Sequence, residues 1–253
     1  MTQQTTVLVT GSKAGIGNGL LAAYAARPNT IAIAAIRDGI DSSSAKAISS
    51  LPTGSGSKII VVNYDAGSET SAKEMVKSLA NQHSITVLDV VVANAGILKG
   101  YGATKDALPG DILEHLTINT LGPILLYQAS VSLLNKSKQE PKFFIISSSI
   151  GSNGLMDGFP MPLIAYGMSK AAVNFAAGKM HREEERLVVV PVQPGWVQTT
   201  MGERAASIVG MEAKDVPVTL ETSVGGLMKI FDATTKKEHS GKFWDQNFET
   251  VPW

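Results

Sequence analysis

The stretch Val7-Leu-Val-Thr-Gly-Ser-Lys-Ala-Gly-Ile-Gly17 decides how this chain is expected to fold. The apolar, β-branched run at residues 7–9 predicts a buried strand, and a helical sequence follows directly from residue 15. Glycines stand at positions 11, 15 and 17, in the turn between the two. Because glycine has no Cβ, the turn can be tight and a pyrophosphate can approach the amides of the helix N-terminus. A tight turn without a ligand would need the same glycines.

The strand-then-helix pattern recurs along the whole chain. Strands are predicted at residues 7–9, 30–36, 58–63, 87–93, 143–147, 187–193 and 242–244, and helices at 15–26, 43–50, 68–82, 109–134, 165–184 and 220–233. The strands read as nearly continuous apolar runs, which is typical of a parallel sheet with helices on both faces. We therefore expect an α/β Rossmann fold with a doubly wound, seven-stranded parallel sheet, and one domain over residues 1–253.

Composition narrows the class of function. Lys plus Arg and Asp plus Glu number 22 each, so no charge bias favours nucleic acid or an anionic membrane as a partner. There is no cysteine, and the four histidines fall on separate predicted elements, so we expect no metal site. No apolar run approaches the length of a membrane span, and the first residues do not resemble a signal peptide. The sequence favours a cytoplasmic protein that acts on a small molecule.

The second predicted strand ends in Ala34-Ala-Ile-Arg-Asp38, where a nucleotide-binding fold meets the adenosine ribose. A guanidinium at this point suits a 2′-phosphate, whereas a carboxylate accepts bonds from a free 2′-hydroxyl. Arg37, with Lys13 as a second cation, favours NADPH. Asp38 would favour NADH if the register shifted by one residue, and an Arg-Asp pair on a solvated loop is the structural alternative.

Tyr166 and Lys170 lie four residues apart in Ala165-Tyr-Gly-Met-Ser-Lys-Ala-Ala172. Positions i and i+4 share one face of a helix, so the Lys170 ammonium is expected near the Tyr166 phenol. An unperturbed phenol has a pKa of about 10, and a nearby cation favours its anionic form. The pair therefore predicts a general acid/base at neutral pH. Two side chains that snorkel at the surface would be the alternative.

These features together resemble one known family. The glycine spacing, Asn94-Ala-Gly96, the serines at 147–149, the Tyr166/Lys170 pair and Pro194-Gly195 resemble the classical short-chain dehydrogenase/reductase family, over nearly the whole chain. The segment Gln193-Pro-Gly-Trp-Val-Gln-Thr-Thr-Met201 and the ending Ser240-Gly-Lys-Phe-Trp244 are similar to sniffer-type carbonyl reductases and to fungal norsolorinic-acid-ketoreductase-like proteins.

The resemblance implies a catalytic tetrad of Asn119, Ser148, Tyr166 and Lys170. Tyr166 would exchange a proton with the carbonyl oxygen, and Ser148 would donate a hydrogen bond to that oxygen. Lys170 would hold the nicotinamide ribose and lower the phenol pKa, and Asn119 would hold a water that links Lys170 to solvent. Ser147 or Ser149 could instead bond backbone at the strand end, and Asn119 could be a helix-kink or interhelical asparagine.

The resemblance also implies the residues that contact the dinucleotide. Asn94 would shape the wall beneath the ribose, with a turn asparagine as the alternative, and Asp65 would contact the adenine amine, with a helix N-cap near Ser68 as the alternative. Ala14 stands where many NADPH-using relatives carry a basic residue, which speaks against NADPH. The full expected set is Gly11, Ser12, Lys13, Gly15, Ile16, Gly17, Arg37, Asp65, Asn94, Ala95, Gly96, Tyr166, Lys170, Pro194, Gly195, Val197 and Thr199.

The substrate is expected to be a bulky, hydrophobic ketone or aldehyde. Residues 199–218 would form a substrate lid, and residues 153–162, which lengthen the usual gap between Ser148 and Tyr166, would border the substrate. Apolar candidates for the pocket are Leu155, Met156, Phe159, Trp196, Met201, Ile208, Val209 and Met211, although these side chains could also fill core or interface.

The expected activity is that of an NADPH-dependent carbonyl reductase. The alternatives are a non-catalytic NADP-binding regulator, an NAD-preferring alcohol dehydrogenase, and a dehydratase or epimerase. Helices 109–134 and 165–184 commonly form the dimer interface in the family, so the resemblance implies a homodimer or homotetramer.

Overall fold

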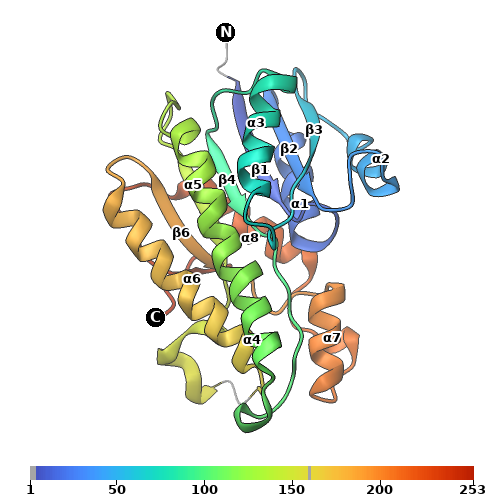
Figure 1. Ribbon diagram of the computed structural model, residues 1–253, viewed down its shortest axis with the longest axis vertical. Coiled ribbons are helices and arrows are strands. Elements are labelled where there is room, and N and C mark those ends of the chain that lie inside the picture. The colour runs from blue at the N-terminus through green and yellow to red at the C-terminus, as the bar shows by residue number, and fades with distance from the viewer. Residues whose placement is uncertain (1–3, 159–160) are drawn as a thin grey trace.

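A computed structural model describes residues 4–158 and 161–253. Seven strands form one parallel sheet in the order β3-β2-β1-β4-β5-β6-β7. The predicted doubly wound Rossmann fold is therefore confirmed (Figure 1). The strands are β1 (Thr5–Thr10), β2 (Thr30–Ile36), β3 (Lys58–Asn63), β4 (Val90–Ala93), β5 (Lys142–Ile146), β6 (Val188–Gln193) and β7 (Trp244–Asp245).

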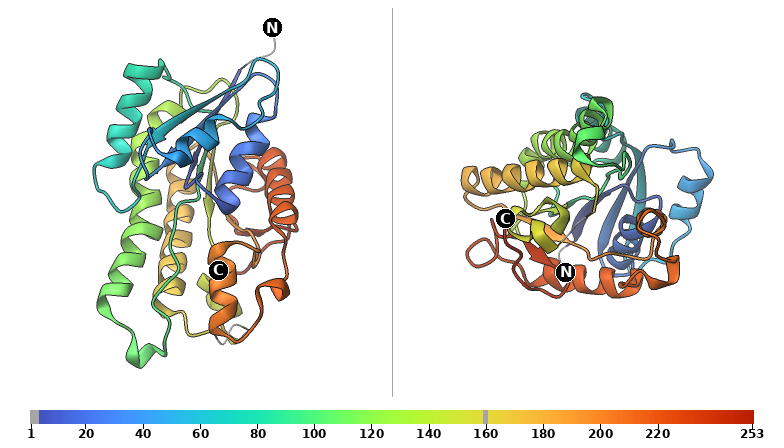
Figure 2. Two further views of the ribbon diagram at one scale, coloured as in Figure 1. Left: turned by 90° about the vertical axis from the view of Figure 1, so that its right-hand side faces the viewer. Right: turned by 90° about the horizontal axis from the view of Figure 1, so that it is seen from below.

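Helices cover both faces of the sheet, as the apolar strands require (Figure 2). One layer holds α3 (Ser71–His83), α5 (Gly122–Leu134) and α6 (Ile164–Glu183), and the other holds α1 (Gly15–Ala25), α2 (Ser43–Ser49) and α8 (Leu220–Ala233). In β1, Leu8 packs under the first layer, while Val7 and Val9 pack under the second. All three are fully buried, and burial of such a side chain stabilises the fold by about 1.5–3 kcal/mol.

The long helix predicted at 109–134 is present but interrupted. It consists of α4 (Pro109–His115), a π-helical turn (Leu116–Leu121) and α5. Pro123 has no amide hydrogen, so it cannot donate the α-helical bond to the carbonyl of Asn119, and the turn widens instead. Gly122 N–H accordingly donates to the carbonyl of Thr117, five residues back. The wide turn lies beside α6, the helix that carries Tyr166.

Several other elements differ from the sequence prediction. The helix predicted from residue 68 begins at Ser71, because an Asp65 side-chain oxygen accepts from Gly67 N–H and closes a turn first. The last strand lies at Trp244–Asp245 rather than 242–244. A further helix, α7 (Thr200–Ile208), forms inside the predicted lid, where Thr199 caps it by accepting from Gly202 N–H at 3.2 Å.

The sheet order places a crevice at the carboxyl ends of its central strands. The chain leaves β1 toward β2 on one side and returns to β4 on the other, so β1 and β4 are neighbours from which the connections diverge. Ligands of open α/β sheets bind at this switch point. The glycine turn after β1 and the Asn94-Ala-Gly96 segment after β4 therefore meet there.

Candidate active site

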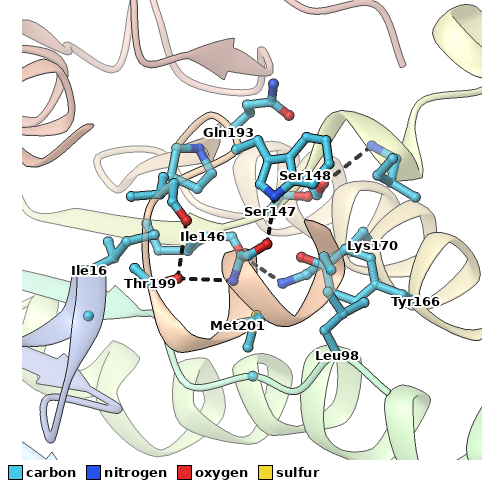
Figure 3. A pocket seen from close by; sticks show the side chains of 18 of the residues that line it. Ile16, Leu98, Ile146, Ser147, Ser148, Tyr166, Lys170, Gln193, Thr199 and Met201 are labelled. Atoms are coloured by element: carbon cyan, nitrogen blue, oxygen red, sulfur yellow. Dashed lines mark hydrogen bonds between the residues drawn. The ribbon is translucent and has the colours of Figure 1, made fainter. Parts of the chain in front are cut away.

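A cleft of about 650 Å³ opens above the carboxyl ends of the central strands. Figure 3 shows labelled side chains that reach it from different elements: Ile16 from α1, Leu98 from the loop after β4, Ser148 from the end of β5, Tyr166 and Lys170 from α6, and Met201 from α7. Residues far apart in the sequence thus enclose one space.

One end of the cleft is a glycine cradle. Gly11 has φ +67°, a conformation that other residues rarely adopt. A Cβ added to Gly17 would lie 2.5 Å from the Gly11 carbonyl oxygen and would also overlap the Asn94 amide. That Asn94 amide donates to the Thr10 carbonyl at 2.9 Å, so it ties the two central loops together. Asn94 therefore lines the cleft and also supports the turn.

The cradle fits the phosphates of a dinucleotide. The N-cap of α1, Ala14, provides no side-chain hydrogen bond, and the first turn carries no acidic residue. The amides of this turn therefore lack the partners that a capping side chain would supply, and the helix dipole favours an anion there. Gly11, Gly15 and Ile16 all line the cleft beside them.

Most residues expected to contact the dinucleotide line the cleft. These are Gly11, Lys13, Gly15, Ile16, Asn94, Ala95, Gly96, Tyr166, Lys170, Pro194, Gly195, Val197 and Thr199. Four do not line it: Ser12, Gly17, Arg37 and Asp65. Ser12 is fully buried and donates to the Val9 carbonyl, so it supports the turn from behind. Asp65 uses one carboxylate oxygen to accept from Gly67 N–H at 2.9 Å.

The charged residues at the end of β2 lie beyond the cradle. Asp38 forms an ion pair with Lys13 and accepts a hydrogen bond from the Ser44 hydroxyl at 3.0 Å. These two partners, together with the charge of Arg37, lower the pKa of the Asp38 carboxyl. Arg37 itself is exposed, and among residues 4–158 and 161–253 its guanidinium has no ion-pair partner. The group therefore holds two cations and one carboxylate.

The other end of the cleft holds Ser148, Tyr166 and Lys170. The Ser148 hydroxyl hydrogen-bonds the phenol of Tyr166, and it also accepts from Ile150 N–H at 3.3 Å. The neighbouring serines are engaged elsewhere: Ser147 donates to the Asn174 side chain at 2.6 Å, and Ser149 N–H donates to Gln193. Among the three serines, only the Ser148 side chain meets the tyrosine.

Burial sets the protonation of this group. Burial raises the pKa of Tyr166 to about 12, although the hydrogen bond from Ser148 opposes the rise. Burial also lowers the pKa of Lys170 to about 8. The Lys170 ammonium donates to the Ile146 carbonyl at 2.7 Å and lies 5.5 Å from the centre of the Tyr166 ring. The phenol pKa is therefore raised rather than lowered in this structure, because burial is the largest influence on it.

Asn119 does not line the cleft, and its side chain bridges two elements. Its oxygen accepts from Ile97 N–H at 2.8 Å, and its amide donates to the Ile97 carbonyl and to the Ser169 hydroxyl, both at 3.0 Å. Both amide hydrogens are used, so the side chain keeps only an oxygen lone pair for a water. Asn119 therefore joins its own helix to α6, which is the interhelical role that the sequence offered as the alternative to holding a water.

The substrate end of the cleft is apolar, but its walls differ from those expected. Trp196 and Met201 line it as predicted, together with Leu98, Met161 and Leu163. Leu155, Met156, Ile208, Val209 and Met211 do not line it, and Phe159 lies outside the described residues. Leu98 follows β4 and Leu163 precedes α6, so neither belongs to a segment that the sequence marks as a lid or an insertion.

The inserted segment is held by the other end of the chain. Short 3-10 turns occupy Ser149–Gly151 and Asn153–Gly158, and Gly158 and Met161 reach the cleft. Ser152 donates to the Pro252 carbonyl at 2.6 Å, and Gly154 N–H donates to the Trp253 carbonyl at 3.0 Å. Residues 252–253 therefore fix one wall of the substrate end.

The described part of the chain holds neither a metal-binding cluster nor a membrane-spanning helix. In residues 4–158 and 161–253, no group of His, Cys, Asp or Glu side chains is arranged to hold a metal ion. Over the same residues, every helix is too short or too polar to cross a membrane.

The chain is similar to known proteins in sequence and in fold. A model of the short chain dehydrogenase family matches residues 5–208. The norsolorinic acid ketoreductase of Dothistroma septosporum is 40% identical over 255 residues, which cover 99% of this chain and 93% of that protein. The NADPH-bound carbonyl reductase from chicken fatty liver superposes with a TM-score of 0.85 at 28% identity, over 99% of this chain and all of that one. The fold is shared with carbonyl reductase Sniffer of D. melanogaster, which superposes with a TM-score of 0.81 at 22% identity. The match covers 99% of this chain and 100% of that one.

Proposed function

The chain belongs to the short-chain dehydrogenase family, and on that premise we propose that it is an NADPH-dependent carbonyl reductase acting on a bulky hydrophobic ketone or aldehyde. One observation carries the proposal: Ser148, Tyr166 and Lys170 stand at the apolar end of a cleft whose other end is a glycine cradle. The similar fungal ketoreductase and the similar NADPH-bound carbonyl reductase support the same activity.

The chain offers contacts along the whole length of a dinucleotide. The first-turn amides of α1 and the glycine cradle would hold the phosphates, and Asn94 would lie beneath a ribose. Lys170 and the segment from Pro194 to Thr199 would hold the nicotinamide end. When bound, NADPH supplies the hydride that reduces the carbonyl carbon.

Tyr166 is the proposed general acid. Its pKa of about 12 keeps the phenol protonated at neutral pH, so it can donate to the carbonyl oxygen as the carbon is reduced. The phenol O–H bond breaks, the alcohol O–H bond forms, and the phenolate is left near the Lys170 ammonium. Ser148, which bonds the phenol, would donate to the same carbonyl oxygen. The protonated phenol is the form that reduction requires, whereas the reverse reaction requires the phenolate.

The proton that Tyr166 gives up would be replaced from solvent through Lys170 and a water near the wide turn at Asn119. The Asn119 side chain is committed to Ile97 and Ser169, but Pro123 removes the α-helical donor to the Asn119 carbonyl. We propose that this carbonyl, rather than the side-chain amide, faces the water of the relay.

The charges at the end of β2 favour the phosphorylated cofactor. Lys13 and Arg37 outnumber Asp38, and the carboxylate is already engaged by Lys13 and Ser44. A 2′-phosphate would complement the remaining positive charge, whereas the ion pair with Lys13 offsets the negative charge that Asp38 would offer to a free 2′-hydroxyl. Asp65 would reach the adenine amine with the carboxylate oxygen that Gly67 N–H does not use.

The substrate end of the cleft suits a large apolar carbonyl compound. Its polar groups are those of the catalytic end, while Leu98, Met161, Leu163, Trp196 and Met201 supply the walls. We propose that residues 199–218, which include α7, act as a lid. A parallel bridge between Val197 and Val218 ties the base of this segment together.

We further propose that the protein is a cytoplasmic homodimer or homotetramer. The interrupted helix of α4 and α5 lies beside α6 (Figure 1), and these helices leave large apolar side chains exposed. Examples are Leu113 on α4 and Phe175 on α6, the latter 74% exposed. Phe175→Asp should lower the mass measured by analytical ultracentrifugation if this face is the interface.

The direct test is oxidation of NADPH and NADH with a panel of aryl ketones, keto esters and aldehydes. Reduction with NADPH and much slower reduction with NADH would support the proposal. Tight NADPH binding without turnover of any compound would favour a dinucleotide-binding regulator, and a preference for NADH would favour an NAD-linked alcohol dehydrogenase.

The cofactor preference has its own test in Arg37→Ala. Loss of a charge-assisted hydrogen bond of about 1.5–3 kcal/mol should weaken NADPH binding about 10- to 100-fold and leave NADH binding unchanged. Equal loss for both cofactors would show that Arg37 does not distinguish them.

A further inference from the structure

His115, at the end of α4, touches the proposed general acid. The ring is completely buried, and its centre lies 6.3 Å from that of Tyr166, with the two planes at 85°. This is the edge-to-face arrangement that aromatic rings prefer. The sequence gives no sign of the contact, because His115 and Tyr166 belong to different helices.

Hydrogen bonds fix both the orientation and the tautomer of this ring. Nδ1 lies 2.7 Å from the Asp111 carbonyl, which can only accept, so Nδ1 carries a hydrogen. Nε2 lies 3.2 Å from the amide nitrogen of Lys99, which can only donate, so Nε2 is unprotonated. The two bonds together require the neutral ring, and neither nitrogen is left to bind a metal or a substrate.

The Lys99 amide belongs to the loop that forms one wall of the cleft. Leu98, its neighbour, lines the substrate end. One turn away on the same helical face, Asn119 holds Ile97 at both its amide and its carbonyl. His115 and Asn119, at i and i+4, thus hold consecutive parts of the loop at residues 97–99.

The two contacts of His115 serve different parts of the site. The ring edge limits the motion of the Tyr166 ring, whose hydroxyl must meet the carbonyl oxygen. The Nε2 acceptor limits the motion of the loop at residues 97–99. Leu98 in this loop must pack against the apolar part of the substrate. Both parts must be in place together for a bulky carbonyl compound to react, and one buried side chain holds both.

We propose that His115 is a positioning residue that fixes the ring of Tyr166 by its edge and the Leu98 wall by Nε2. The proposal rests on the proposed carbonyl reductase function, and it adds a residue that sets how well the substrate fits and how fast it reacts. His115 itself neither touches the reacting atoms nor exchanges a proton with them.

Two substitutions separate the two contacts. His115→Phe keeps an aromatic edge against Tyr166 and removes the acceptor of the Lys99 amide, so the ketone KM should rise about tenfold while kcat changes less than about threefold. His115→Gln keeps an acceptor for the Lys99 amide and removes the ring, so KM should return to within about threefold of wild type while kcat falls about tenfold. The NADPH Kd should change in neither.

A matched control substitution uses another histidine. The Nδ1 atom of His239 accepts from Thr235 N–H at 3.3 Å in a partly buried aromatic cluster with Trp244 and Phe248. His239→Phe makes the same chemical change away from the cleft and should alter neither KM nor kcat. If His115 had only a structural role, both of its variants would unfold at a lower temperature, and neither would change KM and kcat by different factors.

Hydrogen exchange of the ligand-free protein tests the loop contact without turnover. The Lys99 amide should be protected in wild type and in His115→Gln and should exchange about tenfold faster in His115→Phe. Equal protection in all three, or KM and kcat that move together in both variants, would overturn the proposal. A wild type that reduces no ketone would refute the proposed function, and the Lys99 exchange would still decide whether His115 holds the loop.

Discussion

Replacement of Lys170 by methionine should stabilise the ligand-free protein while it removes activity. Lys170 is 5% exposed, and burial lowers the pKa of its ammonium from 10.5 to about 8. A shift of this size means that keeping the charge in the folded protein costs about 3 kcal/mol at neutral pH. Methionine has a similar length and no charge, so Lys170→Met removes that cost.

The hydrogen bond to the Ile146 carbonyl is lost in the same variant. That bond, at 2.7 Å, contributes about 1 kcal/mol, so the net gain at pH 7 should be about 2 kcal/mol. The folded-state pKa lies below the unfolded one, so the cost of the charge is complete below about pH 8 and disappears as the pH rises toward about 10.5. The advantage of the variant should therefore shrink by about 2 kcal/mol between pH 7 and about pH 9.5.

Urea unfolding of both proteins at the two pH values measures this difference. The titration of Tyr166, whose pKa is raised, begins above this range and affects both proteins alike. A variant that is less stable than wild type at pH 7, or a stability difference that does not change with pH, would refute the account of a desolvated ammonium at this site. Such a result would also weaken the case that Lys170 is retained for function rather than for folding.

Four further substitutions test other parts of the site. Gly17→Ala places a Cβ 2.5 Å from the Gly11 carbonyl oxygen, so we expect a loss of about 3 kcal/mol in unfolding free energy and weaker NADPH binding by calorimetry. Ser148→Ala should lower kcat about 100-fold with an unchanged NADPH Kd, whereas Ser147→Ala, which loses a bond to Asn174, should mainly lower stability by about 1 kcal/mol. Gly154→Ala would bring a Cβ to 2.9 Å from Pro252 and should raise the ketone KM without affecting NADPH affinity.

The fold and the family were predictable because their signals are local. The glycine turn lies within residues 11–17, and the Tyr166/Lys170 pair is set by helical spacing, so neither needs knowledge of distant contacts. The apolar strands specify a parallel sheet in the same way. The family model and the similar ketoreductase confirm the resemblance that these patterns indicated.

The properties that were missed depend on side chains from separate elements. The direction of the Tyr166 pKa follows from burial, which a sequence motif does not report. The Asn119 side chain is used by Ile97, and the Leu98 wall and the His115 contact arise where the loop after β4 meets α4. Pairing of Lys13 with Asp38 likewise needs the turn after β1 to lie beside the end of β2.

Single-turnover oxidation of NADPH with a bulky aryl ketone, in wild type and in Tyr166→Phe, tests the central claim most directly. The variant keeps the ring against His115 and loses only the phenolic hydroxyl group. The account predicts rapid oxidation by wild type, a fall of at least about 100-fold in the variant, and nearly equal NADPH affinity in the two. Oxidation at the wild-type rate in Tyr166→Phe would contradict the assignment of Tyr166 as the general acid.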